Sequence, residues 1–286
     1  MRLKVIVLLL VITILQANAM SDKSIKEYMG NYVKTKMKLD IKHIDIISTY
    51  PIEDAPGWHV HFLDMVVKVK MGNAYQDALV KKTVFTKGDR ITVNLMKKGK
   101  LKRDGTRRKS RSYTELLKPL VPIDAYDNEH FLAGSKNAPH KILVFSDPFC
   151  PYCSKKIPEI LKVVRANPKV YGLYYYHFPL LQIHPAADVT TKVMHLLHKK
   201  GEIDKMIALY DLSIEPKETS TDKILKAIKT KIGMTFTKKE ISSIKTKEAL
   251  RFDMVMKRRL QVTGTPTIFI DGKWDRLRKE YKKYAK

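Results

Sequence analysis

Cysteine is scarce in this sequence: the 286 residues include only two, too few for a scaffold stapled by disulfides. Long apolar segments are also rare. The one apolar run of more than ten residues lies at the extreme N-terminus, so the chain is not a protein of several membrane-spanning helices. Acidic residues are outnumbered, with 29 Asp and Glu against 55 Lys and Arg. Hydrophobic residues make up 44% of the chain, which excludes general disorder and a collagen-like fibre.

The formal net charge of +26 raises the question of a nucleic-acid partner. Two features speak against one: the basic residues are spread over the whole chain, and the chain begins with an export signal. The densest basic run, Lys97–Arg111, has the composition of a solvated hairpin tip. We expect no nucleic acid. A basic surface that faces anionic lipid or acidic clients, and a simple compositional bias, both stay open.

The first segment, Met1–Ala19, has the three parts of a secretory signal peptide in order. Arg2 and Lys4 supply the positive end. Val5–Leu15 is apolar but too short to span ~30 Å of hydrocarbon, and Ala17–Ala19 has the small-x-small pattern of a cleavage site. The alternative is an uncleaved membrane anchor. We predict export and cleavage after Ala19.

Residues 20–110 have the pattern of a small α+β domain. Apolar residues at helical spacing predict a helix over Ser24–Lys38. Strands are predicted at Ile41–Tyr50, Trp58–Lys70, Ala78–Thr86 and Arg90–Leu95. His59 and His61 share one face of a strand and form either a metal pair or ordinary strand histidines; we favour the second. No catalytic constellation is present in this domain.

Residues 111–130 form a predicted linker helix that Pro119 and Pro122 break or bend. From there the pattern changes to alternating strands and helices over residues 131–286. Predicted strands are Lys141–Ser146, Val170–Phe178 and Thr267–Asp271, and predicted helices are Ser154–Arg165, a mostly helical insertion over about 184–260, and a short charged helix at Arg276–Lys286. This order is typical of an α/β thioredoxin-like domain.

The two cysteines lie in one motif, Cys150-Pro151-Tyr152-Cys153, between a buried strand and a helix. At a helix start this spacing puts the two Cα atoms ~5 Å apart, so a disulfide can open and close with little movement. The positive helix end lowers the pKa of a thiol. We expect Cys150 to be exposed and nucleophilic, and Cys153 to be shielded and to resolve the mixed disulfide. Pro151 suits the first helical turn.

The segment Gly264–Thr267 is the second half of the predicted site. The Thr265–Pro266 bond precedes a buried strand, where a cis-proline loop would face the cysteines and bind an extended client peptide. A trans proline at an edge strand is the alternative. Asp147 could relay protons to the cysteines, but a capping or turn role is preferred.

Other assignments of the same residues remain open. The cysteines could form an inert structural disulfide. Zinc is disfavoured because no second cysteine pair exists, whereas copper held by the pair and a remote His177 or His184 is an alternative. His195 and His198 lie one helical turn apart and could share a metal, but a solvated face is preferred. We predict no metal and no cofactor.

The motifs resemble the periplasmic disulfide-interchange proteins of the DsbC/DsbG family. Three segments carry the likeness: Val144–Cys153, His177–Pro179 and Val262–Thr267. The order of signal peptide, small α+β domain, linker helix and thioredoxin-like domain agrees as well. The N-terminal part matches in architecture more than in motif.

The resemblance implies a homodimer held by cystatin-like N-terminal dimerisation domains. It implies that Cys150 and Cys153 are the redox pair, that Thr265 and Pro266 form the cis-proline loop, and that Pro151 and Tyr152 help bind substrate. It also implies location in the periplasm, misdisulfided exported proteins as clients, and a membrane redox partner. Threonine before the proline is isomerase-like, but the Pro-Tyr dipeptide leaves the direction open. A disulfide-donating oxidase like DsbA, a copper chaperone, and a client-binding chaperone with an idle disulfide remain alternatives.

Overall fold

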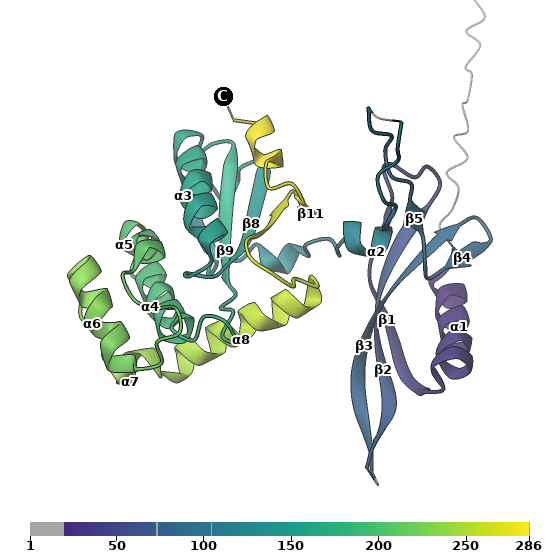
Figure 1. The fold of residues 1–286 in the computed structure, drawn as a ribbon, viewed down its shortest axis with the longest axis horizontal. Helices are drawn as coiled ribbons and strands as arrows, with labels where there is room; N and C mark the ends of the chain where they lie inside the picture. The colour runs from purple at the N-terminus through teal and green to yellow at the C-terminus, as the bar shows by residue number, and fades with distance from the viewer. Residues whose placement is uncertain (1–19, 73, 104, 286) are drawn as a thin grey trace, which may run out of the picture. The chain divides into compact units, whose positions relative to one another are not determined.

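The computed structural model describes residues 20–72, 74–103 and 105–285 (Figure 1). It divides the chain into two compact units, residues 1–116 and residues 117–286. The signal peptide predicted over Met1–Ala19 lies outside the described residues. Within the described ranges, none of the helices combines the length and apolar character needed to cross a membrane.

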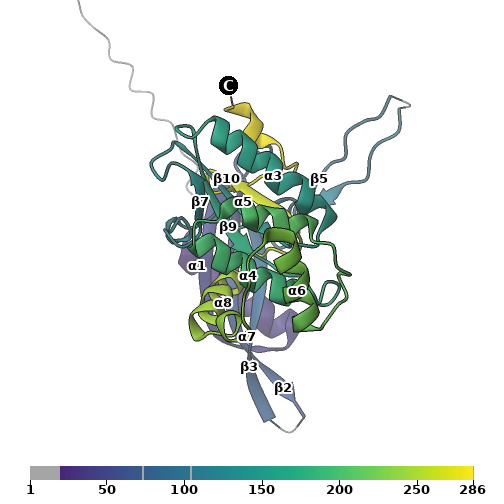
Figure 2. The ribbon, with the colours of Figure 1, turned by 90° about the vertical axis from the view of Figure 1, so that its left-hand side faces the viewer.

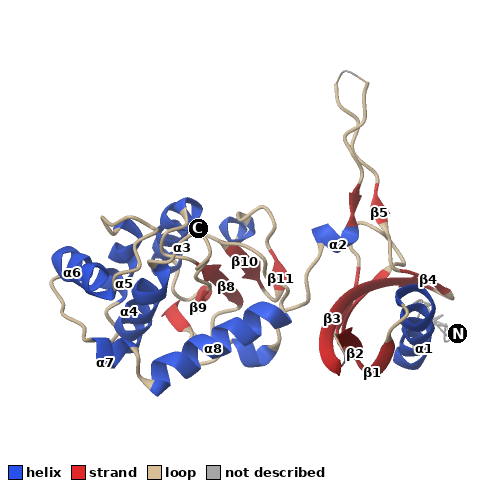
Figure 3. Cartoon of the chain, turned by 60° about the horizontal axis from the view of Figure 1, so that its bottom comes forward, coloured by secondary structure: helices blue, strands red, loops and turns tan. Residues whose placement is uncertain are grey.

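The main body of the first unit is helix α1 packed against a four-stranded antiparallel sheet of order β1–β2–β3–β4 (Figure 3). Its elements are α1 Asp22–Tyr32, continued by a π-helical turn Val33–Met37, then β1 Asp40–Pro51, β2 His59–Met71, β3 Ala74–Lys87 and β4 Arg90–Thr92. The Ser21 side chain caps α1 by accepting from the Ser24 N–H at 3.2 Å. Apolar residues of α1 pack on Leu63 and Met65 of β2 and form the core of this unit.

Strand histidine His61 is a core residue of this sheet and is buried. Its ring nitrogens make hydrogen bonds with the hydroxyls of Thr49 at 3.0 Å and Thr86 at 2.8 Å. Burial lowers the pKa of His61 to about 4, and the neighbouring His59 adds to the effect. The ordinary structural role preferred from the sequence agrees with these contacts.

The basic run forms a hairpin between two short strands, β5 Met96–Lys97 and β6 Arg111–Ser112 (Figure 3). The following helix, α2 Tyr113–Leu116, is only four residues long. The linker helix predicted over 111–130 is therefore wrong for most of its length. Two prolines, at 119 and 122, lack the N–H that a helix needs, and the Val121 N–H bonds to the Gly272 carbonyl at 2.9 Å, inside the second unit.

The second unit is built on a five-stranded sheet of order β11–β10–β8–β9–β7, in which β8 and β9 run parallel. The strands are β7 Phe131–Gly134, β8 His140–Ser146, β9 Tyr171–His177, β10 Thr267–Ile270 and β11 Lys273–Trp274. Every residue of β9 is buried. The sequence patterns missed β7, which has four residues and an irregular register with β9.

Helices cover both faces of this sheet (Figures 1 and 2). They are α3 Pro151–Ala166, α4 Ala187–Lys199, α5 Ile203–Ala208, α6 Thr221–Ile232, α7 Lys238–Ile241 and α8 Ile244–Arg259. Tyr175 belongs to the core shared with α3 and α4, whereas Tyr174 and Tyr176 belong to the core shared with the end of α8. The α4–α8 segment agrees with the predicted helical insertion.

The charged helix predicted over Arg276–Lys286 is reduced to a short 3-10 turn, Glu280–Lys283. The chain end is fixed by side-chain packing instead. Tyr281 is buried, and its hydroxyl donates to a carboxylate oxygen of Glu159 on α3 at 2.9 Å. In a continuous helix, the helical periodicity would set the direction of the Tyr281 side chain. The observed 3-10 segment instead leaves the ring in the core.

Candidate active site

The site begins where β8 ends. Cys150 is the residue before the first turn of α3, with extended backbone angles (φ −73°, ψ 119°), and Pro151 takes the first helical position. The Cys153 N–H donates to the Cys150 carbonyl at 2.9 Å, which closes the first turn over the two thiols. A buried strand followed by Pro at a helix start thus places Cys150 at the positive end of a 16-residue helix.

Both thiols are free. Cys153 is shielded as predicted, whereas Cys150 is less accessible than the sequence suggests. Cys153 is fully buried, and Cys150 is only 6% exposed, so the expectation of an exposed Cys150 is wrong. The reason is the loop before β10, which covers the sulfur: the Cys150 thiol lies 3.4 Å from the Thr265 carbonyl oxygen. The neighbouring Tyr152 side chain, by contrast, is 69% exposed.

The two thiols have opposite acidities. The pKa of Cys150 is lowered to about 5, first by a hydrogen bond from the Cys153 thiol and further by the Thr265 hydroxyl and the N–H groups at the helix start. Burial raises the pKa of Cys153 well above its ordinary value, and so does the neighbouring Cys150 sulfur. At neutral pH, Cys150 is therefore a thiolate and Cys153 a thiol that donates to it.

The loop facing Cys150 contains a cis peptide bond between Thr265 and Pro266. Its position follows from strand pairing: β10 runs antiparallel to β8 with Thr267 opposite Phe145, so the residues before Thr267 lie beside those after Phe145. Pro266 is buried. The Thr265 hydroxyl is also buried and makes no hydrogen bond of ordinary geometry among the described residues, although its proximity to Cys150 helps to lower the pKa of that thiol.

Asp147 organises the loop between β8 and α3. One carboxylate oxygen accepts from the Phe149 N–H at 2.7 Å and from the His184 ring at 3.1 Å, and the other accepts from the Leu180 N–H at 2.6 Å. These bonds tie the cysteine loop to the segment after β9. The turn role preferred from the sequence agrees with this geometry, and the observed bonds of the carboxylate lead away from the cysteines.

Sequence reasoning missed a buried chain of hydroxyl groups next to Cys153. The Ser146 hydroxyl lies 2.5 Å from the hydroxyl of Tyr210, which lies 2.6 Å from the hydroxyl of Tyr175. Tyr175 and Tyr210 pack in the same buried core as Cys153, and the Ser146 hydroxyl partly offsets the raised pKa of the Cys153 thiol. No local pattern identifies this chain, because Tyr210 belongs to the helical insertion, 64 residues after Ser146.

A second feature is a cavity of about 560 Å³ between β9, α4 and α8, lined in part by four histidines. They are His130, His177, His195 and His198. The solvated face preferred for His195 and His198 is wrong: both are half-buried, and His198 donates to the Phe131 carbonyl at 2.9 Å. His177 is buried, and its ring nitrogens have no hydrogen-bond partner among the residues that the structure describes.

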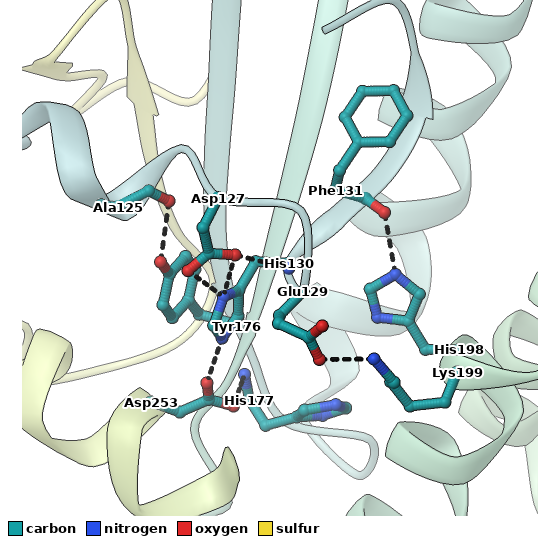
Figure 4. A network of polar contacts seen from close by, with 10 residues as sticks. All are labelled: Ala125, Asp127, Glu129, His130, Phe131, Tyr176, His177, His198, Lys199 and Asp253. Atoms are coloured by element: carbon teal, nitrogen blue, oxygen red, sulfur yellow. Dashed lines mark hydrogen bonds and ion pairs between the residues drawn. The ribbon is translucent and has the colours of Figure 1, made fainter.

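Within the part of the chain that the structure describes, no group of three or more His, Cys, Asp or Glu side chains is arranged to hold a metal ion. The copper alternative, in which Cys150 and Cys153 join His177 or His184, therefore has no assembled ligand set. His184 instead bonds to Asp147. His130 lies between Asp127 and Asp253, with 2.7 Å bonds to each carboxylate (Figure 4).

The fold and the paired cysteines define a thioredoxin-type domain. A family model described as "Thioredoxin" matches residues 127–285, and the chain belongs to that family. "Probable disulfide bond formation protein D" of Bacillus anthracis is 26% identical over 161 residues, which are 52% of this chain and 72% of that protein. "Na(+)/H(+) antiporter NhaA 3" of Salinispora tropica is 23% identical over 154 residues, 54% of this chain. The chain spans only 23% of the length of this antiporter and of a second one from Salinispora arenicola.

Solved structures with a similar fold include BdbD from Bacillus subtilis in its oxidised form, at 14% identity and a TM-score of 0.47. That match covers 58% of this chain and 92% of BdbD. A thioredoxin-like oxidoreductase from Silicibacter pomeroyi matches at 19% identity and a TM-score of 0.43, over 54% of this chain and 87% of its own.

Proposed function

We propose that this protein is a thiol:disulfide oxidoreductase that isomerises or reduces disulfides in exported proteins. One observation carries the proposal: a thiolate at Cys150 with a pKa of about 5 stands beside a buried thiol at Cys153 and under the Thr265–Pro266 loop. A thiol of such low pKa is a good leaving group and remains ionised throughout the neutral range. An inert structural disulfide has no need of these features.

The reaction needs no cofactor, because the sulfurs carry the electrons. The Cys150 thiolate attacks one sulfur of a client disulfide, forms a mixed disulfide and releases the other client sulfur as a thiolate. Isomerisation follows when a client thiolate attacks the mixed disulfide and regenerates Cys150. Reduction follows when Cys153 attacks the Cys150 sulfur: the internal disulfide forms, the client thiol leaves, and the Cys153 proton balances its charge.

Substrate would lie along the Thr265–Pro266 loop. Backbone groups there are available for strand addition by an extended peptide. Neighbouring segments carry exposed apolar side chains: Tyr152 lies within the cysteine motif, and Leu181 and Ile183 belong to the segment that Asp147 ties to the cysteine loop. Such side chains suit unfolded clients, whose apolar residues are exposed.

The direction of the reaction and the cellular setting are part of the proposal. Threonine before the cis-proline and the additional N-terminal unit favour isomerase or reductase activity in a periplasmic homodimer, kept reduced by a membrane partner. The name of the Bacillus anthracis relative, a probable disulfide bond formation protein, favours the oxidase alternative. Both directions use Cys150 and Cys153 in the same roles.

Thiol trapping tests the direction. An alkylating reagent that shifts mobility per free cysteine is applied to protein taken from its native envelope. Mostly reduced cysteines support an isomerase or reductase, and mostly oxidised cysteines support the oxidase alternative or an inert bridge, which mild reductant would fail to open.

Refolding of a scrambled, disulfide-rich client tests the activity itself. We expect wild type and a Ser154→Ala control to be active, and Cys150→Ser to be inactive. Full activity of Cys150→Ser would contradict the proposal and favour a chaperone that merely binds clients.

A further inference from the structure

The hydroxyl groups of Ser146, Tyr210 and Tyr175 form a buried chain in the core that also holds Cys153. The oxygen–oxygen distances are 2.5 Å and 2.6 Å. Ser146 is the last residue of β8, Tyr175 lies on the adjacent strand β9, and Tyr210 comes from the helical insertion. Three separate parts of the domain thus contribute hydroxyls to one line beside the resolving sulfur.

The direction of the hydrogen bonds follows from counting hydrogens. A hydroxyl has one hydrogen to donate. When Cys153 is a thiolate it can only accept, so Ser146 donates to it and must accept from Tyr210. Tyr210, having given its hydrogen to Ser146, must accept from Tyr175. All three hydrogens then point toward the sulfur.

The two phenols keep their hydrogens throughout the working range. Burial raises the pKa of Tyr175 and of Tyr210 well above the ordinary tyrosine value. Both side chains are deep in the core, where hydrogen bonds along a chain polarise one another. The chain is therefore a fixed set of donors rather than a titrating base.

The polar neighbours of Cys153 act on its pKa in opposite directions. The Cys150 sulfur raises the pKa, whereas the Asp147 N–H and the Ser146 hydroxyl lower it. The Asp147 carboxylate bonds to Phe149, Leu180 and His184. Ser146, with Tyr210 and Tyr175 behind it, is thus the main side-chain donor available to a Cys153 thiolate.

We propose that this hydroxyl chain stabilises the thiolate of Cys153 when it resolves the mixed disulfide, with Ser146 as a catalytic residue and Tyr210 and Tyr175 as positioning residues. The step is balanced: Cys153 gives its proton to the departing client thiolate, its sulfur bonds to the Cys150 sulfur, and the client–Cys150 bond breaks. The inference rests on the proposed redox function and explains how the buried Cys153 thiol becomes reactive.

Ellman's reagent separates the two steps. Reduced protein releases one coloured thiolate when Cys150 attacks the reagent, and a second when Cys153 resolves the adduct and loses its proton to the buffer. Both phases are followed by stopped flow across a range of pH. We expect Ser146→Ala to slow the second phase about tenfold, Tyr210→Phe about threefold, and both to move its pH midpoint upward.

The first phase should not change in either variant, because Cys150 is ionised by other donors. Ser146→Thr, which keeps a hydroxyl, should restore the second phase. Tyr176→Phe is the matched control: it removes a buried tyrosine hydroxyl that donates to the Ala125 carbonyl at 2.7 Å, on the other face of the same strand. Each variant is first checked for a wild-type thermal transition.

The outcomes are distinct. Wild-type rates and pH midpoints of the second phase in folded Ser146→Ala and Tyr210→Phe would overturn the hydroxyl chain while leaving the redox function intact. An equal slowing in Tyr176→Phe would also overturn it, because the effect would be general loosening of the core. Absence of the first phase in wild type would instead refute the proposed function.

Discussion

The Cys150 sulfur lies 3.4 Å from the carbonyl oxygen of Thr265, a residue 115 positions later in the chain. The contact joins the start of α3 to the loop before β10. It explains why a nucleophile at a helix tip is nevertheless almost buried. Under the proposed function, we therefore expect a client disulfide to reach Cys150 only as part of an extended segment that lies along the Thr265–Pro266 loop.

Replacing Thr265 by valine should make Cys150 less acidic. The variant keeps the shape of the side chain but removes the hydroxyl that helps to lower the pKa of Cys150. We expect the pKa to rise by about half a unit, because the hydroxyl acts on the thiolate as a nearby dipole without a hydrogen bond of ordinary geometry, and the other donors remain. The ultraviolet absorbance of the thiolate, followed against pH, measures this shift. Thr263→Val, at an exposed position of the same loop, serves as the control and should leave the pKa unchanged.

Reduced protein should become more stable as the pH rises from about 5 toward about 8.5. The pKa of Cys150 is about 5 in the folded state, and a free thiol titrates near 8.5, so the unfolded chain binds more protons between these values. The stabilisation is complete above the unfolded value and is lost as the pH falls through about 5. We expect about 1–2 kcal/mol near neutral pH, after allowance for solvent screening.

Denaturant unfolding of wild type and of Cys150→Ala across this range measures the effect. The difference between their free energies of unfolding should grow with pH. A difference that stays constant from acid to alkaline pH would show that Cys150 is not an acidic thiol.

The sequence was sufficient for the parts of the structure that depend on local order. Buried strands, the Cys-Pro-Tyr-Cys helix start and the helical insertion follow from runs and periodicities that lie within one element. The strand β7 was missed because it is short and depends on Gly134, where a Cβ would lie 2.0 Å from the Tyr171 carbonyl oxygen. A close approach between Gly134 and Tyr171, which are far apart in the sequence, leaves no periodic pattern of residues.

The site also has parts that the sequence predicts and parts that it does not. The redox pair and the facing proline loop were predictable because each is a short motif of residues that are neighbours in the chain. The burial of Cys150 and the hydroxyls of Ser146 and Tyr210 are not, because each depends on a distant segment packing against the cysteine loop. His195 and His198 were misjudged for the same reason: their helix faces a cavity closed by β9 and α8 rather than solvent.

Loss of the Asp147 carboxylate should destabilise the fold. Asp147→Ala leaves the N–H groups of Phe149 and Leu180 without their acceptor in a buried loop. We expect a loss of about 3 kcal/mol in the free energy of unfolding. Thermal or denaturant unfolding measures it, with Asp188→Ala as the control. Asp188 pairs with Lys192 on the surface of α4, so its loss should cost about 0.5 kcal/mol or less. Equal losses in the two variants would contradict the organising role of Asp147.

The histidines around the cavity should titrate far apart, although they lie close together. Burial alone lowers the pKa of His130, but the hydrogen bond and charge of Asp253, with those of Asp127, raise it above the ordinary value. Within the described part of the chain no carboxylate bonds to His195, and burial lowers its pKa to about 4. At any pH between these two pKa values we therefore expect His130 to be more fully protonated than His195.

Proton NMR titration of the imidazole rings distinguishes the two. The His130 signal should titrate above about 6.5 in wild type, and Asp253→Asn should move it downward while the His195 titration changes little. Because the folded pKa of His130 is raised, its ion pairs stabilise the domain below about pH 6.5, and this contribution is lost as the pH rises through the folded value. A His130 signal that titrates below about 6.5 in wild type would mean that desolvation outweighs the two carboxylates. The link that Asp253 provides between α8 and the segment before β7 would then be a bond between neutral groups rather than an ion pair.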